Sequence, residues 1–182
     1  MIILGIDPGS RFTGYGIIRC SGNSSALLDY GVIRTLDKPD QGGRLKAIYD
    51  GVDRLIRKHA PDECALEMPV YGKNPQSMLK LGRAQAAAML AAMNHGLTVT
   101  EYTPKEIKKS VTGNGNAAKE QVRFMVRTVL SLPADHPVLQ LDASDALAIS
   151  ICHSHRASHG STSEESYRGW EAFINANPGR VR

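Results

Sequence analysis

The chain begins with Met1-Ile-Ile-Leu-Gly-Ile-Asp7-Pro-Gly-Ser10, an apolar run that ends abruptly on a carboxylate and a Pro-Gly pair. Residues 2–7 have the composition of a buried strand. Asp, Pro and Gly are all turn residues, so Asp7 could simply begin a turn after that strand. A carboxylate at a strand tip could also belong to a site that holds a cation or a phosphate. Both interpretations of Asp7 stay open at this point.

The segments that follow predict a mixed α/β sheet. Apolar segments at 13–20 and 26–36 are joined by short polar links, which favours an antiparallel meander of three strands. Apolar segments then alternate with helical patterns, and this order is typical of a twisted sheet flanked by helices. The expected later strands are 63–70 and 97–103, and the expected helices are 45–56, 77–94 (starting at Asn74-Pro75), 104–112, 118–130 and 142–155.

Length and composition indicate a globular protein. With 182 residues, 42% hydrophobic and 22% charged, the chain can build one ordinary domain, expected at 1–155. Residues 156–182 are polar and are expected to form a mobile or loosely docked tail. No apolar run approaches the roughly 20 residues of a membrane helix, and no signal-peptide pattern is present, so a cytoplasmic protein with three reduced cysteines is expected.

Carboxylates interrupt three patterns that otherwise look buried. Besides Asp7, Glu67 lies within an apolar segment, and Asp142 and Asp145 lie within another. Taken singly, Asp7 could start a turn, Asp142 could cap a helix and Glu67 could be salt-bridged. Asp145 resists such an explanation because it falls inside the helix, one turn after Asp142. Burying an unpaired carboxylate costs several kcal/mol, so each acid needs a partner or a cation.

Spacing supplies a joint explanation for these four acids. An i,i+3 pair projects Asp142 and Asp145 from one helix face. If the strands at 2–7 and 63–70 are neighbours, Asp7 and Glu67 lie side by side near their carboxyl ends. Four converging acids would repel one another without divalent cations, and Mg²⁺ prefers such oxygen ligands. Two ions about 4 Å apart would suit phosphodiester cleavage, so the pattern favours a metal-dependent nuclease.

Cations concentrate in two stretches, although the net charge is only +4. Such stretches can be solvated helix faces or a surface for a polyanion. The loop at 113–116 carries two glycines and could be a plain connection or a place where backbone amides approach a phosphate. The cations are Lys73, Lys80 and Arg83 in the first stretch, and Lys105, Lys108, Lys109, Lys119, Arg123 and Arg127 in the second.

Several of these motifs resemble the bacterial Holliday junction resolvases of the RuvC family. The resemblance covers residues 1–155. The matching motifs are Leu4-Gly-Ile-Asp7-Pro-Gly-Ser-Arg11-x-Thr13-Gly-Tyr-Gly16, Glu67, Lys80-Leu-Gly, Val111-Thr-Gly-Asn-Gly115 with Lys119, and Asp142-Ala-Ser-Asp145-Ala-Leu-Ala.

The resemblance implies an RNase H-like mixed sheet, with the first three strands antiparallel and the later strands parallel. It implies a homodimer that cuts two opposed strands of a four-way DNA junction, depends on Mg²⁺ or Mn²⁺, leaves ligatable nicks and works with the RuvA–RuvB branch-migration complex. The implied metal ligands are Asp7, Glu67, Asp142 and Asp145, and the implied catalytic lysines near the scissile phosphate are Lys108 and Lys119.

One position departs from the family pattern. Related sequences carry an aromatic residue three positions after the glutamate, whereas this chain has Val70 there, followed by Tyr71. We expect Tyr71 to stack on a junction base, and ordinary loop packing is the alternative. The expected DNA-contacting residues are Tyr71, Lys73, Lys80, Arg83, Lys105, Lys109, Asn114, Asn116 and Arg123.

Two further expectations concern helices. The segment 77–94 is apolar almost all round, so it is either enclosed in the core or faces a second subunit. His153, His155 and His159 are expected at a solvated helix end rather than in a zinc site.

Two other classes of protein stay open as alternatives. A kinase or actin-like ATPase also opens with a strand, an aspartate and a glycine, but this chain is short for two lobes and shows no second phosphate loop. A junction-binding protein without catalytic activity would bind DNA with or without Mg²⁺ and leave it intact.

Overall fold

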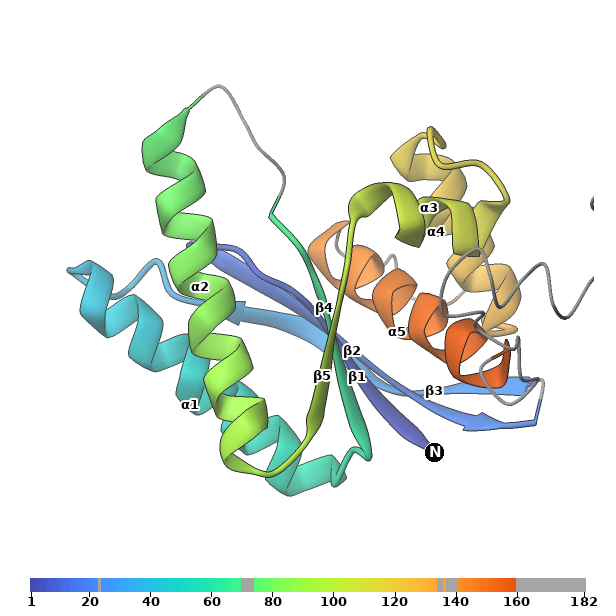
Figure 1. Ribbon diagram of the computed structural model, residues 1–182, viewed down its shortest axis with the longest axis horizontal. Helices are drawn as coiled ribbons and strands as arrows, with labels where there is room; N and C mark the ends of the chain where they lie inside the picture. Colours follow the sequence, from blue (N-terminus) through green and yellow to red (C-terminus); the bar gives the residue numbers. More distant parts are fainter. Residues whose placement is uncertain (23, 70–73, 134–135, 137–140, 160–182) are drawn as a thin grey trace, which may run out of the picture.

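The structure is a computed structural model that describes residues 1–22, 24–69, 74–133, 136 and 141–159, with the side chains of residues 141, 142, 158 and 159 left out. Figure 1 shows a sheet with helices on both faces. The strands are β1 (Ile2–Asp7), β2 (Phe12–Ser21), β3 (Ser24–Arg34), β4 (Glu63–Glu67) and β5 (Thr98–Tyr102). The helices are α1 (Gln41–His59), α2 (Pro75–Asn94), α3 (Pro104–Thr112), α4 (Lys119–Val129) and α5 (Leu141–His159).

The strand order in the sheet is β3-β2-β1-β4-β5. The pairs β1–β2 and β2–β3 are antiparallel, whereas β1–β4 and β4–β5 are parallel. The predicted antiparallel meander is therefore confirmed, and the adjacency of the first and fourth strands, which the argument for Asp7 and Glu67 required, is present. Parallel strands β1 and β4 bring their carboxyl ends to the same edge of the sheet.

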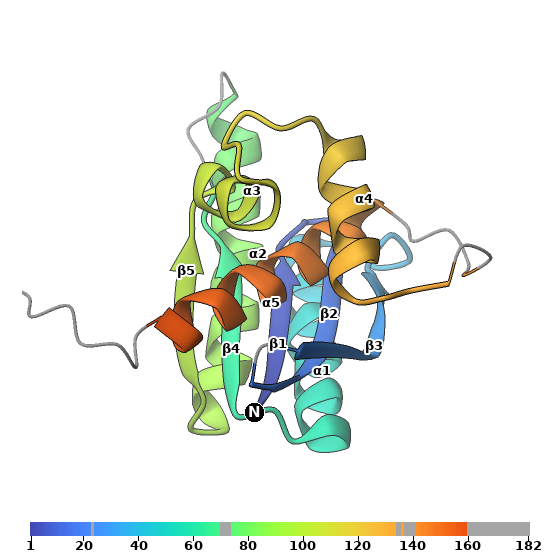
Figure 2. The same cartoon turned by 90° about the vertical axis from the view of Figure 1, so that its right-hand side faces the viewer.

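The helices form two layers, with α1 and α2 on one face of the sheet and α3, α4 and α5 on the other (Figures 1 and 2). Alternating side chains of the strands feed two separate cores. On the α5 side, Ile3 and Ala65 pack with Leu147 and Ile151; on the α1 and α2 side, Leu4 and Leu66 pack in the other core.

Helix boundaries follow local capping chemistry. The Asn74 side chain accepts hydrogen bonds from the amides of Gln76 and Ser77, and Pro75 occupies the first turn, as predicted. Thr103 and Glu106 form a reciprocal capping box at the start of α3. Gly113 ends α3 with a φ of 77°, a left-handed conformation that favours glycine.

Two glycines allow α5 to lie directly on the sheet. A Cβ added to Gly5 would stand 2.3 Å from Ser150 Oγ and 2.4 Å from the Ala146 carbonyl oxygen. A Cβ on Gly16 would stand 2.7 Å from the Leu147 side chain. The Ser150 hydroxyl donates a 2.9 Å hydrogen bond to the Gly16 carbonyl, which fixes α5 across β1 and β2. This close packing sets the position of Asp145, which directly precedes Ala146 on α5.

Some sequence-based boundaries were wrong. Strand β4 ends at Glu67, so this residue lies at the strand tip and not inside the strand. His153 is only 5% exposed and is not at a solvated helix end, because its ring hydrogen bonds with Tyr102 and Glu63 on the sheet. The expected tail begins within α5, which continues to His159, and the rest of the tail lies outside the described residues.

Within the described ranges, no helix is both long and apolar enough to cross a membrane.

Candidate active site

Asp7 and Glu67 end neighbouring parallel strands at the same level. The β1–β4 register pairs Ile6 with Leu66, so the next residues are Asp7 and Glu67. Side chains alternate along a strand, which places Asp7 on the face of Gly5 and Glu67 on the face of Ala65. Gly5 lies against α5 and Ala65 belongs to the core on that side, so both carboxylates face the α5 layer.

Asp145 reaches the same place from α5. Lys119, the first residue of α4, donates a 2.8 Å hydrogen bond from Nζ to Asp145 Oδ2. The Asp145 side chain is 20% exposed and that of Lys119 is 58% exposed. The ion pair therefore lies on the solvent side of the three acids Asp7, Glu67 and Asp145, where a ligand from solvent can approach. We call Asp7, Glu67 and Asp145 the carboxylate cluster.

The charges of the cluster and of its two lysines act on one another. Burial, and after it the Asp145 carboxylate, raises the pKa of Glu67 to about 7, while Lys119 and Lys108 oppose this rise. Hydrogen bonding to Asp145 raises the pKa of Lys119, with further contributions from Asp7 and Glu67. A half-buried acid beside another acid is costly to ionise, so the cluster favours a cation.

Lys108 approaches Glu67 from α3. The helix is fixed by its capping box, and the buried side chains of Ile107 and Val111 face the core. Ile107 and Val111 therefore fix one face of α3 on the core, and Lys108, between them in the sequence, stays half-buried near the cluster. The two lysines that the resemblance singled out thus flank the three carboxylates from α3 and α4.

Asp142 lies in the first turn of α5, one helical turn before Asp145. An N-cap residue precedes the first helical residue. Since Leu141 is already helical, Asp142 lies inside α5 and is not its N-cap. Its side chain lies outside the described residues, so the predicted fourth ligand is located by backbone alone. Among the side chains that are described, no set of three His, Cys, Asp or Glu residues is arranged to hold a metal ion.

The residues nevertheless fit a divalent cation by their chemistry. The cluster offers carboxylate oxygens, the ligands that Mg²⁺ and Mn²⁺ prefer. The high pKa of Glu67 reflects burial and a like charge nearby, and a divalent cation would relieve both. Asp7, Glu67, Asp145 and the helix turn that carries Asp142 would hold it.

The predicted DNA-contacting residues fall in several places. Tyr71 and Lys73 lie outside the described residues, as does Val70. Lys105 and Lys109 are exposed on α3, and Arg123 is half-buried on α4. Lys80 and Arg83 are exposed on α2, which lies on the other face of the sheet (Figure 1).

The loop at 113–116 is held by its own hydrogen bonds. The Asn114 amide donates to Thr112 Oγ1 at 3.1 Å, and the Asn116 amide donates to Asn114 Oδ1 at 2.9 Å. The Gly113 amide donates to the Lys109 carbonyl. These three amides are therefore already engaged, and a phosphate here would meet side chains or the Gly115 amide.

Sequence reasoning missed one hydrogen-bonded network between the sheet and α5. Tyr102 Oη hydrogen bonds with His153 Nδ1 at 2.7 Å, and His153 Nε2 hydrogen bonds with Glu63. Glu63 and Glu67 are four residues apart on β4, so their side chains lie on the same face of the strand. This spacing was the sequence signal that could have placed Glu63 on the side of α5. The network joins the sheet to α5 and so helps to orient the helix that carries Asp145.

The mixed sheet with a carboxylate cluster at the tips of β1 and β4 places this protein in the class of RNase H-like nucleases. The family model "Crossover junction endodeoxyribonuclease RuvC" matches residues 3–153. The chain belongs to this endodeoxyribonuclease family.

Relatives and solved structures agree with this assignment. The chain is 57% identical to the crossover junction endodeoxyribonuclease RuvC of Salinibacter ruber, over 100% of this chain and 99% of the relative. It is 44% identical to that of Porphyromonas gingivalis, over 100% and 97%. The structure of T. thermophilus RuvC in complex with Holliday junction substrate superposes with a TM-score of 0.81 at 31% identity, covering 88% of this chain and 97% of that chain.

Proposed function

We propose that this protein resolves four-way DNA junctions by cutting two opposed strands symmetrically, and thereby acts in recombination and repair. The observation that carries the proposal is the carboxylate cluster at the tips of β1 and β4, with Lys119 bonded to Asp145 at its surface end. The family membership and the junction-bound relative support the choice of substrate.

In this proposal the acids hold a divalent metal, Mg²⁺ or Mn²⁺, with two ions per site. Bound metal would supply an activated water and charge stabilisation for phosphodiester hydrolysis. Asp7 and Glu67 are fixed by adjacent parallel strands, and Asp145 is fixed by the tight packing of α5 on Gly5 and Gly16. Asp142, on the same helix, would complete the set. Rigid supports of this kind keep ligands in place during a reaction.

The two lysines have a separate role in the proposal. Lys119 is protonated, since bonding to Asp145 raises its pKa, and it is exposed enough to reach a phosphate. Lys108 stands near Glu67 on the opposite flank. Fixed cations at this place would stabilise the negative charge that develops on the scissile phosphate. Lys105, Lys109, Asn114, Asn116 and Arg123 would extend the contact along the DNA backbone, and Tyr71, Lys73 and Lys80 are kept as proposed contacts.

A homodimer would match the two-fold symmetry of a junction, and α2 offers a face for it. The buried residues of α2 include Ala84, Ala88 and Ala91, so one face of the helix packs on the core, but the helix is not enclosed in the core as one of the two sequence interpretations expected. Its opposite face carries an exposed stripe. The stripe consists of Leu79, Arg83, Ala86, Leu90 and Met93, spaced four and three residues apart.

The apolar members of this stripe are unusually open. Leu79, Leu90 and Met93 are 56%, 54% and 57% exposed. Repeats of four and three residues place side chains along one helical seam, which suits packing against a second copy of the helix. Arg83 lies in the same seam, so its proposed contact with DNA competes with a place in the dimer interface. Cooperation with the RuvA–RuvB complex is part of the proposal through the family alone.

The proposal is tested by comparing substrates and metals. The protein is incubated with a synthetic four-way junction or with a linear duplex of the same sequence, in EDTA, Mg²⁺ or Mn²⁺. We expect paired symmetric nicks in the junction that ligase can seal, only with a divalent metal. Equal cutting of the duplex, or junction binding without cutting in every metal, would contradict it.

A further inference from the structure

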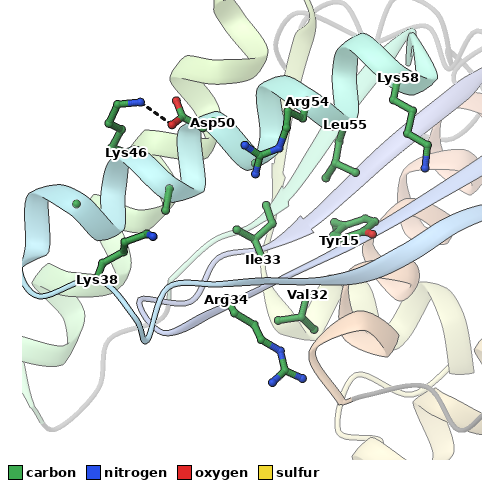
Figure 3. Close-up of a pocket in the computed structure, with 13 residues that line it drawn as sticks. Tyr15, Val32, Ile33, Arg34, Lys38, Lys46, Asp50, Arg54, Leu55 and Lys58 are labelled. Atoms are coloured by element: carbon green, nitrogen blue, oxygen red, sulfur yellow. Dashed lines mark hydrogen bonds and ion pairs between the residues drawn. The ribbon is translucent and has the colours of Figure 1, made fainter.

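A hollow of about 720 Å³ lies between α1 and the carboxyl-terminal end of β3 (Figure 3). It is lined by residues of β2, β3, α1 and the turn between β3 and α1, and none of the candidate active-site residues lines it. Helix α1 covers the face of the sheet opposite α5 (Figure 1). We call this hollow the α1–β3 groove, and its lining residue Val32 is in register, through Gly14, with Asp7 two strands away.

The α1–β3 groove opens on the edge of the sheet. Strand β3 is the outermost strand on this side. In Figure 3, Ile33 points toward α1, whereas Val32 and Arg34 lie on the other side of the strand, yet all three line the hollow. A hollow that touches both faces of a strand must pass along its edge. Within the described part of the chain, no other segment donates a backbone hydrogen bond to this outer edge of β3.

The groove has a partly apolar floor that local packing holds in place. Gly31 lets the Tyr15 ring cross β3, since a Cβ at Gly31 would lie 2.8 Å from Tyr15 Oη. Gly51 of α1 similarly admits Ile33, because a Cβ there would lie 2.7 Å from Ile33 Cδ1. Tyr15, Ile33 and Leu55 stay half-buried along the floor. They offer contact area to a ligand that has apolar as well as charged groups.

The rim of the groove is strongly basic. Asp50 is the acid among its lining residues, and it is already paired with Lys46. Lys58 is paired with Asp29 at 2.9 Å. Within the described residues, Arg54 and Arg34 have no ion-pair partner, and the Arg34 guanidinium lies 6.0 Å from the Phe12 ring centroid. The cations of the rim are Arg34, Lys38, Lys46, Arg54 and Lys58.

We propose that the α1–β3 groove binds an extended acidic peptide segment of a partner protein, which adds as a strand to the open edge of β3. Three observations carry this choice: an edge of β3 that no described segment pairs with, a floor of half-buried apolar side chains, and two arginines that have no ion-pair partner among the described residues. Added strands gain affinity from backbone hydrogen bonds and specificity from alternate side chains. A DNA duplex would meet the cations but would use neither the strand edge nor the apolar floor.

The test measures binding of a fluorescein-labelled peptide of alternating glutamate and valine to the full chain by fluorescence anisotropy. Arg54→Glu should weaken binding about tenfold, since it replaces attraction by repulsion at the rim. Arg19→Glu is the matched control, because Arg19 is exposed on β2 and does not line the groove. A lysine–valine peptide should not bind.

Backbone methylation separates strand addition from charge attraction. Two versions of the acidic peptide are N-methylated, one at its odd residues and one at its even residues. Both keep all charges, but each loses the backbone N–H donors along one edge of the peptide strand. We expect one version to lose binding and the other to retain it. The proposal would be overturned if both methylated peptides bound equally well. It would also be overturned if Arg19→Glu weakened peptide binding as much as Arg54→Glu does. A third contrary result would be that Arg54→Glu weakens binding of a labelled single-stranded DNA but not of the peptide. These measurements do not involve cleavage, so they are independent of the nuclease function.

Discussion

Lys119 Nζ and Asp145 Oδ2 are 2.8 Å apart, and this ion pair joins the start of α4 to α5 at the carboxylate cluster. The lysine is more exposed than the aspartate. A cation in this place balances the acids without metal and faces the solvent from which DNA would come. This geometry makes Lys119 the clearest candidate for a residue that acts on the substrate rather than on the fold.

Lys119→Ala should impair turnover more than binding. Loss of one charge that stabilises the scissile phosphate should lower the rate of junction cleavage about a hundredfold. One phosphate contact among many should change the junction Kd by no more than about threefold. Single-turnover cleavage and gel-shift titration measure the two quantities, with Arg19→Ala, at the other end of β2, as the control. Parallel losses in both would show that Lys119 serves only to bind DNA.

Glu67 should make the stability of the metal-free protein depend on pH. Its pKa rises from 4.5 to about 7 on folding, so the folded state binds the proton more tightly than the unfolded state. The free energy of unfolding should therefore fall as pH rises from about 4.5 to about 7, and this contribution should stay lost above pH 7.

Urea unfolding in EDTA across this pH range measures the effect. Glu67→Gln should flatten the slope, whereas Glu120→Gln, an exposed acid on α4, should leave it unchanged. Added Mg²⁺ should stabilise the parent more at pH 7.5 than at pH 5.5, because metal and proton compete for the carboxylate. A slope that persists in Glu67→Gln would place the titrating group elsewhere.

Gly5→Ala should separate α5 from the sheet. The new methyl group would overlap Ser150 Oγ and the Ala146 carbonyl, and such overpacking typically costs about 1–3 kcal/mol. Because α5 carries Asp145, cleavage should fall as well. Gly82→Ala on α2 is the matched control, since its Cβ would meet nothing within 4 Å and should leave stability unchanged or raise it. Thermal unfolding of both variants tests the contrast.

Leu90→Glu should shift the protein toward monomer. A charge in the middle of the exposed stripe on α2 would be buried against the second subunit. Lys80→Glu changes charge on the same helix outside the stripe and serves as the control. Sedimentation equilibrium gives the oligomeric state of each. A monomeric parent, or an unchanged dimer in Leu90→Glu, would refute the proposed interface.

Much of this arrangement could be predicted from the sequence because it depends on short-range patterns. The apolar run before Asp7 and the spacing of Asp142 and Asp145 predicted a strand tip and a shared helix face. The adjacency of β1 and β4 was a condition of the argument, and the structure meets it. The exact end of β4 at Glu67 was missed, although Pro69, which cannot donate a hydrogen bond to a neighbouring strand, was an available signal.

Other features depend on contacts between distant segments, which a single sequence does not reveal. The burial of His153 follows from its bonds to Tyr102 and Glu63, on two different strands. The floor of the α1–β3 groove likewise depends on Gly31, which leaves room for Tyr15 from the neighbouring strand. No local pattern distinguishes such a glycine from one in an ordinary strand.

The most direct test of the central claim compares the parent protein with Asp7→Asn on a synthetic four-way junction in Mg²⁺. Asp50→Asn, on the opposite face of the sheet, is the matched control. The carboxylate cluster predicts paired symmetric nicks from the parent and from Asp50→Asn, and junction binding without cutting from Asp7→Asn. Cutting by Asp7→Asn at the rate of the parent would contradict the assignment of the cluster as the nuclease centre.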